Sequence, residues 1–232
     1  MPAGSEEALR HLYGTIINPV SKEKLKSFLS EKEFLELEKK FNKENVFVWG
    51  FEPGKINNIV WKNLVSGDVL IFVPSKEDLI ITILKFKTRN PKLAEELWGP
   101  SERSGQFWEM IVFIEFLVAI NLEKREFLDK LRYSEKDVLQ GSRDVTENFS
   151  KTFEDIEEFI KKFSKQRINL EFYRNLPIQE MMKRGHSIGE EIKALREEIP
   201  KLEKMIGIGG ITPRLIEEKK KRLKELLRRA AR

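Results

Sequence analysis

The sequence predicts an α+β fold in which helices flank an antiparallel sheet or small barrel, followed by a C-terminal helical extension. Two observations support this class. Three dense apolar segments lie between residues 46 and 88, and their short links favour antiparallel pairing. The segments before and after them repeat their apolar residues at helical spacing.

Residues 5–44 are predicted to be helical. Ser21 and Ser30 each precede a segment with acidic residues in its first turn, as N-cap residues do. The apolar residues that follow recur at helical spacing, at Leu25, Phe28, Leu29, Phe34, Leu35, Leu37 and Phe41. This apolar face is expected to pack on the next segment of the chain.

The predicted strands begin at residue 46 with the run VFVWGF, which a Pro-Gly pair ends. A short helix over residues 55–64 and a turn at Gly67 and Asp68 lead to the second strand, VLIFVP. Alternation in the third strand places Leu79, Ile81, Ile83 and Lys85 on one side and Ile80, Thr82, Leu84 and Phe86 on the other.

Further elements follow the third strand. Pro91 begins a helix, and a Gly/Ser-rich loop then separates Trp98 from Trp108. Residues 109–122 are predicted to form a strand, and residues 148–166 a single amphipathic helix with a stripe of Phe and Ile side chains.

The C-terminal part is predicted to be irregular after Arg167 and then helical. A helix over residues 187–206 is interrupted near Pro200, because proline lacks the N–H that a helix interior needs. The final helix has Thr212 as its cap and Pro213 at its first position. The two helices are suited to form a helical hairpin.

The composition excludes several classes of protein. Hydrophobic residues make up 40% and charged residues 35%, which is enough for a core beneath a highly charged exterior typical of thermophiles. The absence of cysteine excludes disulfides, thiolate nucleophiles and cysteine zinc sites. No signal-like or bilayer-length apolar run occurs, so a cytoplasmic location without membrane contact is expected.

The basic charge is confined to the end of the sequence. Residues 212–232 carry a net charge of +6, while the whole chain carries +5. Residues 1–211 therefore have a net charge of −1. Any contact of the folded body with nucleic acid must therefore depend on local groups and not on a general basic field.

No catalytic, cofactor or metal site is predicted. The two histidines, His11 and His186, are far apart in sequence, and the carboxylates lie mostly in the pattern of solvated helix faces. The GIGGI segment at 207–211 lacks the GK[ST] ending of a phosphate loop. A nuclease site between Asp68 and Lys87 is disfavoured because its acidic residues are not compactly spaced.

The four tryptophans are the best candidates for ligand binding. Trp49 ends the first strand, Trp61 lies in the short helix, and Trp98 and Trp108 flank the loop. Indole rings stack on planar bases, and Asn side chains can bind a base's polar edge. Each tryptophan alone is as compatible with a core position, but a set of four predicts at least one in a pocket.

The order of these features resembles the PUA-like superfamily, specifically its EVE and YTH-type domains. The resemblance is carried by VWGF, then INNIVWKNLVSGDVLIFV with its Gly67-Asp68 turn, then ITILKFKTRNPKLAEELWG, then FWEMIVFIEFL. The sequence is also similar to the PUA-like N-terminal domains of archaeal McrB restriction proteins, whose later part is a motor GTPase. The chain then divides into an N-terminal helical segment (1–44) that packs on the barrel, the PUA-like domain (45–167), and a linker with C-terminal helices (168–232).

The resemblance implies a curved β-barrel that binds nucleic acid, DNA more than RNA, and takes a methylated base into an aromatic pocket by flipping it. The implied pocket residues are Trp49, Phe51, Asn57, Asn58, Trp61 and Trp98. The implied contacts to the nucleic-acid backbone are Lys55, Lys62, Lys87, Arg89 and Arg103. No cofactor is implied, and a motor or nuclease subunit is the expected partner within a restriction system.

Two features depart from that family: the helical addition before residue 45, and a body that is not basic although phosphate contacts usually supply most of the affinity. An assembly subunit with structural tryptophans is therefore the alternative. Its C-terminal helices would join a partner or a second copy through Leu202, Met205, Ile206, Leu215, Ile216, Leu223, Leu226 and Leu227.

Overall fold

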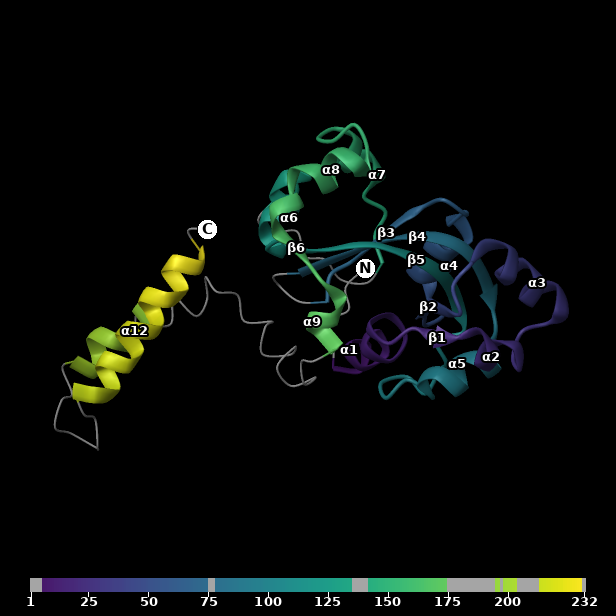
Figure 1. Cartoon of the computed structure of the whole chain (residues 1–232), viewed down its shortest axis with the longest axis horizontal. Coiled ribbons are helices and arrows are strands. Elements are labelled where there is room, and N and C mark those ends of the chain that lie inside the picture. Colours follow the sequence, from purple (N-terminus) through teal and green to yellow (C-terminus); the bar gives the residue numbers. More distant parts are fainter. Residues whose placement is uncertain are drawn as a thin grey trace. The chain divides into compact units, whose positions relative to one another are not determined.

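The fold is given by a computed structural model, which describes residues 6–74, 78–134, 142–174, 195–196, 198–203 and 213–230. The chain divides into two compact units, residues 1–185 and 186–232. The first unit contains the whole sheet and most of the helices (Figure 1).

The described helices of the first unit are α1 (Glu6–Leu12), the π-helix η1 (Tyr13–Ile17), α2 (Lys22–Lys26), α3 (Glu31–Lys40), α4 (Lys55–Asn63), α5 (Pro91–Trp98), α6 (Lys124–Lys130), α7 (Thr146–Ser150), α8 (Ile156–Lys162), the 3₁₀-helix η2 (Ser164–Gln166) and α9 (Leu170–Arg174). The strands are β1 (Val20–Ser21), β2 (Asn45–Phe51), β3 (Val69–Phe72), β4 (Asp78–Arg89), β5 (Met110–Asn121) and β6 (Arg167–Ile168).

The strands form one antiparallel sheet in the order β1-β2-β5-β4-β3, with β6 pairing β5. β5 is central because β4 pairs along nearly its whole length, while β2 and β6 pair with its first and last parts. The α+β class and the antiparallel pairing are confirmed. Among the described residues β1 does not pair with β3, so the sheet is open and does not form a clearly closed barrel.

β4 and β5 each contain one extra residue, Lys85 in β4 and Leu117 in β5, that stands opposite no residue of the other strand. Such a bulge bends a strand and turns the residues beyond it to the other face. The two strands accordingly curve in Figure 1. Lys85 is held at its bulge by an ion pair with Glu115 at 2.7 Å.

The bulge at Lys85 corrects one prediction. Strict alternation placed Phe86 on the same side as Leu84, whereas Phe86 stacks on Phe113, with ring centroids 5.2 Å apart, in a different core cluster from Leu84. The extra residue shifts the two-residue period by one, and an alternating apolar pattern gives no sign of where this happens.

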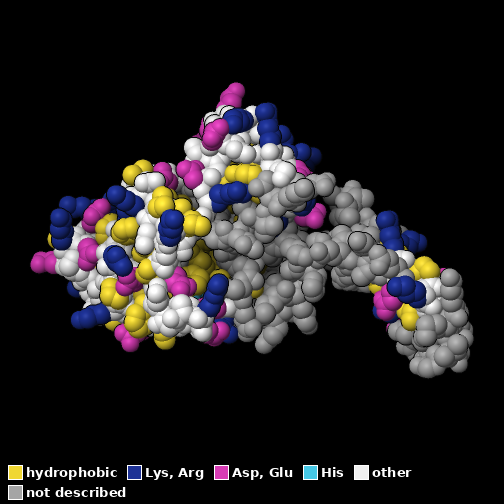
Figure 2. Space-filling model, turned by 180° about the vertical axis from the view of Figure 1, so that it is seen from behind, with side chains coloured by type: hydrophobic (Ala, Val, Ile, Leu, Met, Phe, Trp, Pro, Cys, Tyr) yellow, Lys and Arg dark blue, Asp and Glu magenta, His cyan; other side chains and the backbone are white. Residues whose placement is uncertain are grey.

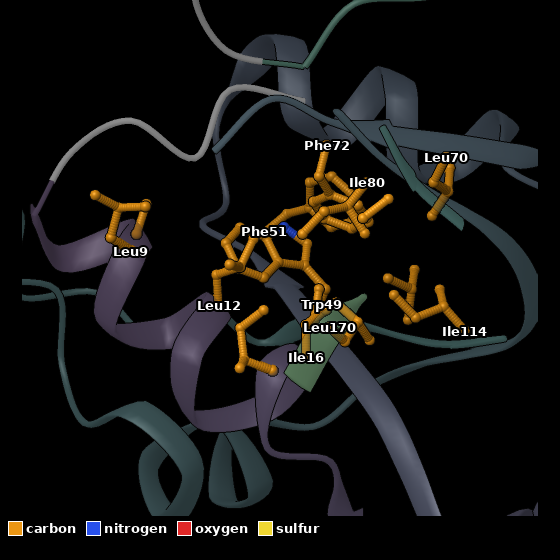
Figure 3. Packing of buried hydrophobic residues seen from close by; sticks show 14 of the residues in the cluster. Leu9, Leu12, Ile16, Trp49, Phe51, Leu70, Phe72, Ile80, Ile114 and Leu170 are labelled. Atoms are coloured by element: carbon orange, nitrogen blue, oxygen red, sulfur yellow. The ribbon is translucent and has the colours of Figure 1, made fainter. Parts of the chain in front are cut away.

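Three apolar clusters fill the two faces of the sheet. The Trp49 core lies under α1, η1 and α9, and it includes Leu12, Ile16, Trp49, Phe51, Phe72, Ile80, Ile114 and Leu170 (Figure 3). The Phe86 core, under α2, α3 and α5, includes Leu25, Leu37, Phe86, Leu93 and Phe113. The Phe159 core, under α6, α7 and α8, includes Leu79, Ile120, Phe127, Phe153 and Phe159. Neighbouring β5 residues alternate between the Trp49 and Phe86 cores, so these lie on opposite faces.

Ser21 and Ser30 precede α2 and α3 as predicted, whereas Val20–Ser21 form strand β1 within the segment predicted to be helical. The Ser21 side chain accepts a hydrogen bond from the backbone of Lys24, and Ser30 forms a capping box with Glu33. Asn90 caps α5, with Pro91 at the first helical position. Leu25, Leu29, Leu37 and Phe41 of the predicted apolar face pack in the Phe86 core, whereas Leu35 is 50% exposed.

The prediction of a single helix over residues 148–166 is wrong. The segment contains two short helices, α7 and α8, because the Asp155 side chain accepts from the backbone of Glu158 and begins a new helix. The aromatic stripe survives the break, since Phe149, Phe153 and Phe159 still pack together. The segment after Arg167, predicted to be irregular, contains β6 and α9.

The second unit contains α12 (Pro213–Ala230) and helical residues 195–196 and 198–203, the latter continuing through Pro200. Leu195, Ile199 and Ile216 are buried together, so two of the segments pack on each other as the predicted hairpin requires. Leu202 and Leu223 of the predicted partner seam pack beside them. Thr212, Met205, Ile206 and the side chains of Leu215, Leu226 and Leu227 lie outside the described residues. None of the described helices has the length and apolarity needed to cross a membrane.

Candidate functional site

Trp49 and Phe51, two of the predicted pocket residues, lie in the core. They are two residues apart on β2 and therefore share one face. Their exposed fractions are only 3% and 2%, and Figure 3 shows them among the aliphatic side chains of α1 and η1. The Trp49 ring meets the rings of Phe72 and Trp108 edge-on, with centroids 5.2 and 5.4 Å away.

Gly50, between them, lets two tryptophans approach the backbone of β2. A Cβ atom at this position would lie 2.5 Å from the carbonyl oxygen of Trp108 and 2.6 Å from the ring of Trp98. Both distances are far below van der Waals contact, so no side chain fits. The segment that returns from α5 to β5 therefore depends on glycine at this point for its position.

His11 of α1 completes an aromatic group at this place. Its imidazole ring lies 4.5 Å from the ring of Trp108, edge-on, and 5.7 Å from that of Trp98. Ser101, three residues after Trp98, is also buried. We call these four residues, His11, Trp98, Ser101 and Trp108, the His11 cluster.

The polar atoms of the His11 cluster are buried without hydrogen-bond partners. They are Nδ1 of His11, Nε1 of Trp98, Oγ of Ser101 and Nε1 of Trp108. Native proteins pair nearly all such atoms, and each one left unpaired costs about 1–3 kcal/mol. Burial, with a smaller effect of Arg10, lowers the pKa of His11 to about 4, so its ring is neutral at pH 7.

The loop between Trp98 and Trp108 is held in a hairpin and tied to α1. Gly99 and Gly105 have positive φ values of 71° and 70°, and a β-bridge joins Pro100 to Phe107. The backbone N–H of Glu102 donates to the Glu7 side chain at 2.9 Å, and the Glu102 carboxylate pairs with Arg10. The loop that contains Ser101 is therefore anchored to α1, the helix that contains His11.

Polar contacts hold α4 at both ends. At its start, the Asn57 side chain donates to the carbonyl of Glu52 at 2.9 Å. At its end, Lys87 of β4 donates to the carbonyls of Trp61 and Leu64, both at 2.6 Å, and to that of Lys62 at 3.2 Å. The Lys87 ammonium group also lies 4.6 Å from the centre of the Trp61 ring. Burial lowers the pKa of Lys87, against the raising effect of Asp68.

The structure separates the predicted backbone contacts into three groups. Lys87 holds the end of α4, and Arg89 pairs with Glu109, so both have partners within the protein. Lys55 and Lys62 are exposed on α4. Arg103 is exposed in the loop that follows α5.

The predicted pocket residues divide as well. Trp49, Phe51 and Trp61 contribute to one core cluster, while Trp98 lies in the His11 cluster. Trp61 is half-buried, and its Nε1 atom has no hydrogen-bond partner. Asn57 is tied to the backbone, and Asn58 is exposed to solvent.

Sequence reasoning missed His11 and Ser101. A signal for His11 was present, because it lies three residues after Ala8 and one before Leu12, both buried on the inner face of α1. Ser101 has no comparable signal, since a serine in a Gly/Ser-rich loop is ordinarily exposed.

The surface agrees with the charge count of the body. On the face shown in Figure 2, basic, acidic and hydrophobic side chains are interspersed, without a continuous basic area. Among the described residues no three His, Asp or Glu side chains are grouped so that they could hold a metal ion. The site offers ring surfaces and single hydrogen-bonding atoms.

No protein-family model matches the chain, and the search of curated proteins finds no match. Among solved structures, the chain is similar to the N-terminal domain of Thermococcus gammatolerans McrB bound to m5C DNA, with a TM-score of 0.47 and 14% sequence identity. The match covers 69% of this chain and 95% of that one. That domain is of the McrB type that the sequence resembles; the function proposed below depends on the side chains of this chain alone.

Proposed function

We propose that this chain is a nucleic-acid-binding module that recognises a modified base, with the His11 cluster as the place of recognition. The observation that supports this is that His11, Trp98 and Trp108 bring their rings together while a polar atom of each has no hydrogen-bond partner, as does Ser101 Oγ in the adjoining loop. A nucleobase has the complementary chemistry, because it is a flat ring with hydrogen-bonding atoms around its edge.

Binding would relieve the cost of the unpartnered atoms. An indole N–H that pairs with a base acceptor recovers a hydrogen bond worth about 1 kcal/mol. The neutral imidazole of His11 can present its Nδ1 as an acceptor or a donor, depending on the tautomer. Trp98 and Trp108 are partly exposed, so the cluster is near enough to the surface for a small rearrangement to admit a ring.

A methyl group on the base fits the same surroundings. Burying one additional methyl group among aromatic rings contributes about 0.8 kcal/mol, equivalent to a preference of about fourfold. A base inside a duplex must first be flipped out, at a cost of a few kcal/mol. We include flipping in the proposal, with DNA as the first substrate to test.

The experiment is fluorescence-polarisation binding of the full chain to short oligonucleotides of one sequence at fixed salt. The duplexes carry no modification, methylated adenine or methylated cytosine, and RNA of the same sequence is included. Tighter binding to one modified oligonucleotide supports the proposal. Equal binding to all of them, or to none, contradicts it.

Trp98→Phe and Trp108→Phe test the site itself, because each keeps an aromatic ring and removes the N–H donor. We expect either change to weaken binding of the preferred oligonucleotide by about fivefold, the value of one hydrogen bond. Trp61→Phe is the matched control, since its N–H is also unpartnered but lies on α4. Preference for the modified base should survive in this control.

We also propose that the second unit attaches the chain to a motor or nuclease partner of a restriction system, or to a second copy of the chain. Its described residues bury Leu195, Ile199 and Ile216 together, which is a small core for two helices. Such a unit gains stability by pairing further apolar surface. Deletion of residues 186–232 should leave base recognition unchanged and abolish association, measured by light scattering with and without the deletion.

A further inference from the structure

Helix α4 and the turn after it expose an unusual group of apolar side chains. Ile56, Ile59 and Val65 are 63%, 57% and 61% exposed, and Val69, at the start of β3, is 37% exposed. Leu35, on α3, is exposed to a similar degree as a single residue. Single exposed apolar residues are normal, whereas several along one element indicate a surface that another molecule covers.

The charges on α4 indicate what covers it. The helix contains Lys55 and Lys62 and no acidic residue. Both lysines are exposed, and no ion pair is found for either among the residues that the structure describes. They are seven positions apart along the helix, which is two helical turns or about 10 Å along the axis. This spacing lets the two ammonium groups meet different phosphates of one nucleic-acid strand.

The helix is fixed before any ligand arrives. It buries no side chain completely, so its outward residues are not dictated by core packing. Instead, Asn57 holds its start and Lys87 its end through hydrogen bonds to backbone carbonyls. A surface that is already ordered loses less conformational entropy on binding.

We infer that the outward face of α4 is the surface against which duplex DNA lies. Lys55 and Lys62 contact phosphates, and Ile56 and Ile59 make the apolar contacts that DNA-binding proteins direct at thymine methyl groups or between base steps. Trp61 packs α4 on the core that also contains Trp49 and Trp108, which links this surface to the His11 cluster. The inference rests on the proposed function and adds the element that holds the duplex.

Salt dependence of binding separates this inference from the proposed function. The full chain and the variant Lys55→Gln/Lys62→Gln are titrated with a 20-base-pair duplex, unmodified and modified, at several salt concentrations. We expect about tenfold weaker binding to both duplexes, and a slope of log K against log salt that is smaller by about 1.8 for two lost phosphate contacts. Preference for the modified duplex is unchanged.

The matched control is Lys161→Gln/Lys165→Gln, which removes two exposed lysines at α8 and η2 and should leave the slope unchanged. The apolar contacts are tested with Ile56→Ala/Ile59→Ala, for which we expect about tenfold weaker DNA binding. Leu35→Ala is the control and should leave DNA binding unchanged.

Three results would overturn the inference. If the wild-type chain discriminates modified DNA but the α4 lysine variant keeps the wild-type slope, α4 is not the DNA surface and the proposed function stands. If the Ile56→Ala/Ile59→Ala variant binds DNA normally and loses self-association, a second copy of the chain covers the apolar face of α4, and DNA does not. If the wild-type chain binds no duplex, both proposals fall together.

Discussion

The His11 cluster and α4 differ in how their polar and apolar groups are placed. In the cluster, four polar atoms are buried and have no hydrogen-bond partner. In α4, Asn57 and Lys87 hold the two ends through hydrogen bonds to backbone carbonyls, while isoleucine side chains project into solvent. Each arrangement costs stability in the isolated protein, the first in unpaired polar atoms and the second in unburied apolar area. The proposal that a ligand completes both regions rests on these two costs.

The largest effect is expected from Gly50→Ala, which puts a Cβ atom against the carbonyl of Trp108 and the ring of Trp98. The backbone must move to admit it, so we expect a loss of about 3 kcal/mol in the free energy of unfolding, measured by urea denaturation. Gly54→Ala is the control, because a Cβ there meets nothing within 4 Å. Equal losses in the two variants would mean that the tryptophans do not pack on Gly50 as described.

His11 should make stability depend on pH. Its pKa is about 4 in the folded chain and 6.5 when unfolded, so between these values the unfolded state binds a proton that the folded state does not. Stability from this group is complete above pH 6.5 and falls as the pH drops towards 4, by about 3 kcal/mol in total. The carboxylates also titrate here, so the measurement is the difference between wild type and His11→Gln. A constant difference across this range would show that His11 is not buried in its neutral form.

A smaller loss is expected from Lys87→Met, which leaves the carbonyls of Trp61, Lys62 and Leu64 without their donor. We expect about 2 kcal/mol, because bonds from a charged donor are lost. Hydrogen exchange should increase in α4 more than elsewhere. Lys85→Met, on the same strand, removes only a surface ion pair with Glu115 and should cost less than about 1 kcal/mol.

The smallest effect on folding is expected from Ile56→Ser/Ile59→Ser. Both side chains are more than half exposed, so thermal denaturation should show a change within about 0.5 kcal/mol. The same variant should weaken DNA binding. A large loss of stability would mean that these side chains are buried in the protein and are not a free surface.

Much of the fold could be predicted because local signals were strong. Ser21, Ser30 and Pro91 mark helix starts, and the apolar runs give β2, β3, β4 and β5. The bulge at Lys85 could not be predicted from the sequence of β4, because the pairing register also depends on the partner strand. The break at Asp155 was hidden because the stripe of phenylalanines continues across it.

The candidate site was predicted less well than the fold. Tryptophan is suited both to a core and to a ligand pocket, so sequence alone did not separate Trp49, which is buried, from Trp98, which adjoins His11. Lysine is equally ambiguous: Lys87 and Lys62 look alike in sequence, but the first holds a helix end and the second faces solvent. Only the tertiary arrangement assigns their roles.

The ties of α1 and η1 to distant parts of the chain have a consequence for the order of folding. Arg10 pairs with Glu102, and the Tyr13 hydroxyl donates to the carbonyl of Arg174 at 3.0 Å. As the chain emerges from the ribosome, Arg10 of α1 has no Glu102 to pair with until about 90 further residues are made. Tyr13 of η1 has no Arg174 carbonyl to bind until about 160 further residues are made. The contacts that fix α1 and η1 therefore cannot form during synthesis until that length of chain is present.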